Sequence, residues 1–284
     1  MSRALSAKLI ELDSGYSRPI KYLVLTAKTL LAIRRARPRV VFAQNPSIVL
    51  AFIVVLFQRV LSYRAVVDEH SAGLEPLEGR SKVLNAIAAW IIRNAQTVIV
   101  TNDEMSEFCR LRGGRPVVVF DPIPDISPGG PSASPGAHSA EKHLLFICSW
   151  SEDEPVEEFL QAVALAEAEG KFRIAVSVTG KVKAHRLPSA VPKCVTLAGF
   201  VSEERYSELL VSCDAVVVLT KREGCLNCGA YEAIGAGKPG LLSNKRVLRS
   251  LFRQGFLFVE NDPKSIARGL CELTSKLPEL NRGV

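Results

Sequence analysis

The sequence lacks any apolar run long enough to cross a membrane. A bilayer-spanning helix needs about 20 apolar residues, whereas the longest unbroken run, Ile48–Phe57, stops well short of that length. Residues 1–18 contain no apolar segment followed by a cleavage site, so we expect no secretion signal. The seven cysteines are scattered and indicate no disulfide framework. Together these absences favour a protein that stays in the cytoplasm.

Motifs that hold metal ions are also absent from the sequence. It has only four histidines and no Asp-x-Asp pair, so few oxygen or nitrogen ligands are available for a metal site. Cys225 and Cys228 have CxxC spacing, but no second pair of ligands lies near them. We interpret them as small side chains that pack a tight loop. We therefore predict neither a bound metal nor a resident cofactor.

Positive charge is concentrated at the start of the chain. Residues 1–64 contain eleven Lys and Arg against Glu11 and Asp13, an excess of nine, whereas the whole chain has a net charge of +7. The rest of the chain is therefore slightly acidic, which indicates one anionic partner for the N-terminal part. We expect this partner to be a membrane surface, met from the cytoplasmic side, and not a nucleic acid.

Two apolar segments lie within or beside this basic region. Across residues 19–36, apolar side chains recur at helical spacing and form a core face, while Lys21, Lys28 and Arg35 recur every seventh residue beside it. The pattern predicts an amphipathic helix with a basic flank. Residues 48–61 predict a helix that is apolar nearly all round, and a helix of that kind is buried or touches lipid.

Short apolar strands alternate with helices on both sides of a segment rich in Pro, Gly and Ser. Such alternation is typical of parallel sheets, and the segment itself, 124–141, has the composition of a linker. We predict an α/β chain with two Rossmann-like, doubly wound domains, 1–123 and 142–284. With 284 residues and 48% hydrophobic content, the chain is long enough to form both.

The stretch Glu223–Asn244 has the layout of a ligand site. An apolar strand precedes a Gly-bearing turn and a short helix, which residues 238–240 end. Ligands of α/β sheets bind at such turns, where the helix N-terminus offers N–H groups to a phosphate. Glu223 lies in the turn and Glu232 in the helix. Taken alone, the stretch fits an ordinary strand-to-helix turn with two solvated acids equally well.

This stretch resembles the E-x7-E signature of the GT-B glycosyltransferases, especially glycosyltransferase family 4, although here eight residues separate the two acids. Other matching motifs follow in order: FAQNP (Phe42–Pro46), VVDEHSAG (Val66–Gly73), VTND (Val100–Asp103), VFDPIP (Val119–Pro124) and the run Leu197–Thr220. Together they resemble the bacterial relatives of chitobiosyldiphosphodolichol β-mannosyltransferase. The resemblance implies the GT-B fold, in which two Rossmann-like domains face one another across a cleft.

The resemblance also implies an activity and a set of site residues. The activity is transfer of a sugar from a nucleoside-diphosphate-sugar to an acceptor, which we expect to be lipid-linked or a polysaccharide precursor. In the family the first acid touches the transferred sugar and the second holds the nucleotide ribose, roles that fall here on Glu223 and Glu232. Gly224, Gly229 and Asn45 complete the expected substrate-binding set.

The chain departs from the family pattern in three places. It begins near the expected first helix or second strand, so we expect the N-terminal domain to lack its first strand. The longer acid spacing puts the role of Glu223 in question more than that of Glu232. Residues 149–154, SWSEDE, replace the usual Arg and Lys, and their acids would repel phosphate. We assign the cationic role to Lys181 and Arg222, although a solvated side chain explains each position as well.

The segment VVDEHSAG carries the candidate catalytic residues. The resemblance places His70 at the carboxyl end of a strand, in contact with the transferred sugar or the acceptor hydroxyl. An imidazole can accept a proton or polarise a hydroxyl near neutral pH. Asp68 and Glu69 are further candidates for the base, and we expect one of these two acids to face solvent.

Three functions fit these observations. The preferred one is a hexosyltransferase, and the alternative is a non-catalytic GT-B-like subunit that binds a membrane or a partner glycosyltransferase. A sugar-nucleotide epimerase, which shares the architecture, is the third.

Overall fold

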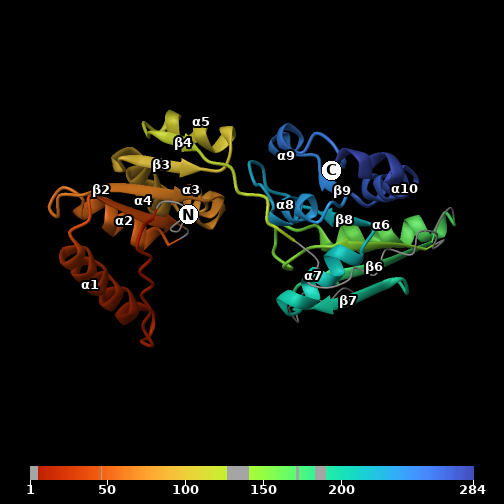
Figure 1. Ribbon diagram of the computed structural model, residues 1–284, viewed down its shortest axis with the longest axis horizontal. Coiled ribbons are helices and arrows are strands. Elements are labelled where there is room, and N and C mark those ends of the chain that lie inside the picture. Colours follow the sequence, from red (N-terminus) through yellow and green to blue (C-terminus); the bar gives the residue numbers. More distant parts are fainter. Residues whose placement is uncertain (1–5, 46, 127–140, 171–172, 183–189) are drawn as a thin grey trace. The chain divides into compact units, whose positions relative to one another are not determined.

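A computed structural model describes residues 6–45, 47–126, 141–170, 173–182 and 190–284. The chain forms two compact units, Met1–Phe120 and Asp121–Val284 (Figure 1). The first unit thus ends slightly before the expected boundary at residue 123. Most of the expected linker, residues 127–140, lies outside the described residues.

The N-terminal unit is built on a parallel sheet of four strands in the order β1-β2-β3-β4. Its strands are β1 (Val40–Asn45), β2 (Arg64–Glu69), β3 (Thr97–Val100) and β4 (Pro116–Val118). Its helices are α1 (Arg18–Ala36), α2 (Ile48–Phe57), α3 (Ser71–Leu74), the 3₁₀ turn η1 (Pro76–Gly79), α4 (Lys82–Asn94) and α5 (Asp103–Leu111). Within the described part of this unit, β1 is the first strand in the chain.

Local signals and apolar burial explain these elements. The side chains of Ser81 and Asn102 accept hydrogen bonds at the starts of α4 and α5, as N-cap residues do. Each strand-to-strand crossover advances in the same direction, and right-handed crossovers then place α2, α4 and α5 on one face of the sheet. All three helices contribute to one apolar core. In the described residues the opposite face is less covered, and Phe42 on β1 is 41% exposed.

Helix α1 differs from its expected packing. Only Ile33 among its described side chains is buried, whereas Leu23, which was expected to be in the core face, is 73% exposed. The expected core face of this helix is therefore wrong for most of its length. The reason is that α1 packs on α2 through few side chains, near Ile33, so that helical periodicity alone overstated its burial.

The C-terminal unit is built on a parallel sheet of six strands in the order β10-β9-β8-β5-β6-β7. Its strands are β5 (Glu141–Phe146), β6 (Arg173–Thr179), β7 (Val195–Gly199), β8 (Ala215–Val218), β9 (Gly240–Ser243) and β10 (Phe256–Val259). Its helices are α6 (Val156–Ala168), α7 (Glu203–Ser212), α8 (Cys228–Gly235), α9 (Arg246–Leu251), α10 (Pro263–Leu280) and the 3₁₀ turn η3 (Asn281–Gly283).

Both faces of this second sheet are covered. Helices α6 and α10 pack on one face around Phe146 and Phe159, whose ring centroids are 4.1 Å apart. Helices α7, α8 and α9 pack on the other face around Leu145 and Phe252. Neighbouring residues of β5 thus enter different cores, because successive side chains of a strand point to opposite faces. This explains why the strands read as unbroken apolar runs in the sequence.

The strand order reverses beside β5. The chain runs from β5 to β6 and β7 on one side, then crosses to β8 and continues to β9 and β10 on the other (Figure 1). The loops that follow β5 and β8 therefore leave the sheet in opposite directions. In doubly wound folds, a crevice opens at this switch point, outside the carboxyl ends of the strands, and binds the ligand. The prediction of two Rossmann-like α/β units is confirmed.

Candidate active site

The loops at the β5/β8 switch point are tied together by Asp153. Its carboxylate accepts a hydrogen bond from the hydroxyl of Thr220 at 3.2 Å, and its backbone carbonyl accepts one from the N–H of Lys221 at 2.6 Å. Asp153 lies in the loop after β5, and the other two residues follow β8. The loops that follow β5 and β8 are thus held in place by hydrogen bonds to one another.

A second set of hydrogen bonds joins the ends of β8, β9 and β10. The N–H of Thr220 donates to the Ser243 hydroxyl at 2.8 Å, and that hydroxyl donates to the side-chain oxygen of Asn261 at 2.7 Å. The amide of Asn261 returns a hydrogen bond to the carbonyl of Thr220 at 2.8 Å. Thr220 and Ser243 are fully buried, so these polar groups stabilise the strand ends by satisfying one another.

Acids of the segment 149–154 interact with other groups of the protein, which the sequence did not lead us to expect. The Glu154 carboxylate accepts hydrogen bonds from the backbone N–H groups of Ser149 and Ser151 at 2.8 to 3.0 Å. Asp153 forms an ion pair with Arg222, with 3.6 Å between the carboxylate oxygen and Nε. Asp153 and Glu154 therefore interact within the protein, which reduces the repulsion that we expected the acids of this segment to exert on a phosphate.

Trp150 closes the end of the neighbouring strand. Its indole N–H donates to the carbonyl of Thr179 at 3.0 Å, and only 2% of the side chain is exposed. Its φ of +62° lies in the left-handed region, which is unfavourable for a bulky residue. Packing must therefore hold it there, and the loop after β5 is a fixed structure in this unit.

The two acids of the signature occupy different environments. Glu223 is 73% exposed and forms an ion pair with Lys245 at 2.5 Å, whereas the Lys245 side chain is 15% exposed. Lys245 is the residue before α9, and one residue, Asn244, separates it from the end of β9. The sequence prediction did not include Lys245, although its place after a predicted strand of the same stretch was an available signal.

Glu232 is half-buried in α8 and receives a short hydrogen bond from the hydroxyl of Tyr206. Tyr206 comes from α7, and burial together with the Glu232 carboxylate raises the pKa of this phenol far above its ordinary value. The hydroxyl therefore keeps its proton and remains a donor. The sequence prediction also missed Tyr206, although it lies within the run Leu197–Thr220 that carried the family resemblance.

Gly224 and Gly229 are needed for the backbone conformation and for close packing in the stretch Glu223–Asn244. Gly224 has a φ of +62° and permits the turn before α8. A Cβ on Gly229 would lie 3.0 Å from a Val218 methyl and 3.2 Å from an Ile147 methyl, so this glycine lets α8 approach the sheet closely. The side chain of Asn227 makes no capping hydrogen bond at the start of α8. The helix therefore presents its first N–H groups without that cap.

The remaining predicted residues lie on other loops. Lys181 is exposed in the loop after β6, at the same edge of the sheet as the switch point. Asp68 and His70 belong to the N-terminal unit, at the end of β2 and at the start of α3, and both are half-buried. Asn45 ends β1 and is fully buried, so its side chain does not reach the solvent.

Glu69 is the fully buried acid of the pair that we considered as bases. It accepts a hydrogen bond of 2.8 Å from the amide of Asn45, on the neighbouring strand. Asp68 is the acid that reaches solvent, which agrees with the expectation that one of the two would do so. Strand alternation accounts for this, because successive side chains lie on opposite faces.

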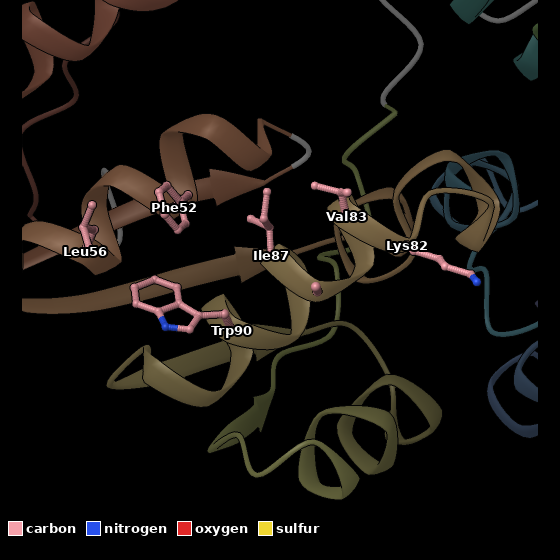
Figure 2. Close-up of a pocket in the computed structure, with 7 residues that line it drawn as sticks. Phe52, Leu56, Lys82, Val83, Ile87 and Trp90 are labelled. Atoms are coloured by element: carbon pink, nitrogen blue, oxygen red, sulfur yellow. The ribbon is translucent and has the colours of Figure 1, made fainter.

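The N-terminal unit also has an open apolar hollow of about 620 Å³ between α2 and α4 (Figure 2). It is lined by Phe52, Leu56, Lys82, Val83, Ala86, Ile87 and Trp90. The rings of Phe52 and Trp90 pack with their centroids 5.1 Å apart. Lys82 is the only cation of the lining, and the hollow otherwise offers carbon surface.

All seven cysteines are free thiols. In the part of the chain that the structure describes, no three His, Cys, Asp or Glu side chains are grouped closely enough to hold a metal ion.

Comparison with known families matches both halves of the chain. Residues 6–122 match the family described as glycosyl transferase 4-like domain, and residues 141–276 match the family described as glycosyl transferases group 1. No curated protein matches the chain.

Solved structures share the fold at low sequence identity. Anabaena HepE in complex with UDP and glucose has a TM-score of 0.71 and 16% identity, with 92% of this chain and 75% of that chain covered. A UDP-forming trehalose-phosphate synthase from Burkholderia xenovorans has a TM-score of 0.72 and 12% identity, covering 95% and 74%.

A putative UDP-N-acetylglucosamine 2-epimerase from Listeria monocytogenes has a TM-score of 0.61 and 11% identity, covering 100% and 80%. The likeness to an epimerase concerns the fold, whereas the family matches in both halves are to glycosyl transferases. Two Rossmann-like units with these two domains identify the chain as a GT-B glycosyltransferase, an enzyme that transfers a sugar from a nucleotide sugar.

Proposed function

We propose that the nucleoside diphosphate of the donor binds to the C-terminal unit at the β5/β8 switch point, with Glu232 holding the ribose. The observation that carries this proposal is the half-buried carboxylate of Glu232 on α8, the helix that follows β8. The hydroxyl of Tyr206, on α7, donates to this carboxylate and orients it. A carboxylate has about four acceptor positions. One hydrogen bond from Tyr206 therefore leaves acceptors for ribose hydroxyls.

UDP is the nucleotide to test first. HepE was solved with UDP, and the Burkholderia trehalose-phosphate synthase is described as UDP-forming. These proteins share the fold with our chain, so their nucleotide is a starting point for the donor assignment.

The leaving diphosphate would be stabilised by cations and by the start of α8. Arg222 lies in the loop between β8 and α8, Lys245 lies between β9 and α9, and Lys181 lies in the loop after β6. Arg222 and Lys245 form ion pairs with Asp153 and Glu223, respectively. A diphosphate can compete for both cations, because its charge exceeds that of one carboxylate. Fixed positive charge of this kind stabilises the charge that grows in the transition state.

The acceptor and the proton transfer are assigned to the N-terminal unit. His70 and Asp68 are the candidates for the group that takes the proton of the acceptor hydroxyl, because both are partly exposed at strand ends. The resemblance to the mannosyltransferase relatives supports a lipid-linked acceptor.

We further propose that the N-terminal unit associates with an anionic membrane surface from the cytoplasmic side. Leu56, Val60 and Val83 are 44%, 76% and 69% exposed, and Arg59 and Lys82 are exposed beside them. Exposed apolar side chains next to cations suit the interface of an anionic bilayer. None of the helices described by the structure has the length and apolar content that a membrane span needs.

Calorimetric titration of UDP into wild type and Glu232→Gln tests the donor site. The variant keeps the shape of the side chain but loses its charge and one acceptor. We expect binding to weaken by about 1.5–3 kcal/mol, a loss of roughly tenfold to hundredfold. Thermal stability should hardly change, because a partly exposed polar residue contributes little to the core.

Glu208→Gln is the matched control, because Glu208 is an exposed acid of α7 that forms an ion pair with Arg205. It removes the same charge away from the switch point, and UDP affinity should stay unchanged. Equal affinities of wild type and Glu232→Gln would refute the ribose role. Failure of UDP, GDP and ADP to bind wild type would refute the donor site itself.

A further inference from the structure

Asn45 and Glu69 form a buried polar pair at the carboxyl ends of β1 and β2. The two residues are register partners in the parallel sheet, and both side chains are fully buried. The amide N–H of Asn45 donates to Oε2 of Glu69 at 2.8 Å. Helix α3 packs directly on the pair, because a Cβ on Gly73 would lie 2.5 Å from Nδ2 and 2.6 Å from Cγ of Asn45.

One atom of each partner is buried and has no hydrogen-bond partner among the residues that the structure describes. These atoms are Oε1 of Glu69 and Oδ1 of Asn45. An ionised carboxylate and an amide oxygen are both acceptors only, so neither can satisfy the other. A single proton on Oε1 changes this, since the acid becomes a donor that can bond to Oδ1. An acid and an amide then exchange two hydrogen bonds, and all four polar groups of the pair are satisfied.

The surroundings of Glu69 favour the protonated form. Burial is the main cause that raises the pKa of Glu69 from 4.5 to about 7, and the charge of Asp68 on the same strand raises it further, against the hydrogen bond from Asn45. Cys109 on α5 faces it as a neutral thiol, since burial raises the pKa of that group to about 12. The charge of Arg112 lowers the pKa of the Cys109 thiol, against the larger effect of burial. His70 is the residue that follows Glu69 in the chain.

The pair lies directly under the segment that carries the candidate catalytic residues. Asp68 and His70 flank Glu69 in the chain, and His70 precedes the first turn of α3. The carbonyl of His70 accepts hydrogen bonds from the N–H groups of Gly73 and Leu74 at 2.8 and 3.2 Å. Gly73 in turn packs on the Asn45–Glu69 pair. The position of His70 is thus coupled to the pair through this turn.

We propose that Glu69 is a positioning residue whose protonated carboxyl closes a neutral acid–amide pair with Asn45, and that this pair fixes the turn carrying His70. Loss of the proton leaves two acceptors, Oε1 of Glu69 and Oδ1 of Asn45, without a donor between them. This loosens the turn that carries His70. The effect of this on turnover rests on the proposed function, whereas the protonated pair itself does not.

Thermal melting of wild type and Glu69→Gln between pH 5 and pH 8 tests the protonated pair. Glutamine mimics the protonated acid, because its amide donates to Oδ1 and its oxygen accepts from Nδ2 at every pH. In wild type the stability from the raised pKa is fully present below pH 4.5 and is lost as pH rises through about 7. The Tm of wild type should therefore fall relative to Glu69→Gln by ~5–10 °C from pH 5 to pH 8.

Glu75→Gln is the control, because Glu75 is an exposed acid just after α3. Its melting should follow wild type at each pH. Parallel curves of wild type and Glu69→Gln would overturn the protonated pair, as would a Glu69→Gln protein that melts far lower at both ends of the range. If that variant does not fold, carbon NMR of wild type with labelled Glu carboxyls tests the protonated pair instead. The carboxyl resonance of Glu69 should titrate near pH 7.

Hydrogen exchange of the Gly73 and Leu74 amides tests the positioning role without turnover. Their protection factors in wild type should fall by about tenfold between pH 6 and pH 8, and should stay constant in Glu69→Gln. Constant protection in wild type would overturn the positioning role. Absence of sugar transfer with normal melting and exchange results would refute the proposed function and leave the acid–amide pair established.

Discussion

The two acids of the candidate donor site differ in how firmly they are held. Glu232 is half-buried and bonded to a phenol from another helix, whereas Glu223 is mostly exposed and paired with one lysine. Only the Glu223 end of the Glu223–Lys245 pair is exposed, because the Lys245 side chain is 15% exposed. The pair can therefore open at little cost only when another anion replaces the carboxylate beside Lys245. Glu223 lies in the loop before α8, whereas Glu232 lies within that helix.

Tyr206→Phe should weaken UDP binding by about 0.5–1.5 kcal/mol, roughly twofold to tenfold. Phenylalanine keeps the ring in place but removes the donor that orients the Glu232 carboxylate. In the double variant with Glu232→Gln, the two losses should not add, because residues in contact are coupled. Calorimetric titration of the two single variants and the double variant measures this coupling.

Tyr22→Phe is the control for this change, because Tyr22 is an exposed tyrosine of α1 in the other unit. Its UDP affinity should equal that of wild type. Stronger binding by Tyr206→Phe would mean that the phenol competes with the ribose for the carboxylate, and would contradict its orienting role.

Helix α1 has large apolar side chains that the rest of the described structure leaves exposed. Ile20, Tyr22, Leu23 and Leu31 are 46% to 73% exposed on it. Two of the cations that we expected to meet a membrane are engaged locally, since Lys21 pairs with Asp13 and Lys28 bonds to its carbonyl. The basic end of the helix, with Arg34 and Arg35 in the last turn, is the better site for a test.

Replacement of Arg34, Arg35 and Arg37 by Glu should release the protein from anionic vesicles. Each cation near an anionic surface contributes about 1 kcal/mol, so loss of three should weaken binding by roughly hundredfold or more. Co-sedimentation with vesicles that contain phosphatidylserine, at moderate salt, measures the effect. Neutral vesicles should bind neither protein strongly.

Replacement of Arg253, Lys264 and Arg268 by Glu provides the matched control, because these exposed cations of the C-terminal unit give the same change in net charge. That variant should bind anionic vesicles like wild type. An equal loss in both variants would indicate a response to net charge alone, and an unchanged N-terminal variant would argue against membrane contact through α1.

The whole molecule consists of a C-terminal unit, the proposed donor unit, with hydrogen bonds that join its strand ends, and a basic N-terminal unit with exposed apolar side chains. The charge that must be neutralised during transfer lies on the donor diphosphate. Arg222, Lys245 and Lys181 are the side chains at the carboxyl edge of the C-terminal sheet that can meet it.

We expect sugar transfer by the whole protein to require no divalent metal. EDTA should change the rate by less than about twofold, because fixed cations supply the stabilisation that a metal provides in other enzymes. A coupled assay of nucleotide release measures this, with calcium-saturated EDTA as the control. Activity that EDTA abolishes and manganese restores would contradict the proposed roles of these cations.

The division into two α/β units, the parallel strands and the glycosyltransferase character could be predicted from the sequence. Apolar runs such as Ala215–Val218 predict buried strands because they are too short for a buried helix and rich in β-branched valine. The alternation with helices then requires crossovers and a parallel sheet. The motif around Glu232 follows from the same local order, since a loop after such a strand lies at the ligand edge.

Only the tertiary structure decided which side chains meet. Tyr206 and Glu232 are 26 positions apart and come together because α7 and α8 share one face of a sheet. Burial of Asn45, and its pairing with Glu69, depends on the register of β1 against β2, which no local pattern specifies. The exposure of α1 likewise depends on what packs beside it. Local propensity determines where helices and strands form. The contacts between them depend on their arrangement in space, and those contacts decide the environment of each charged side chain.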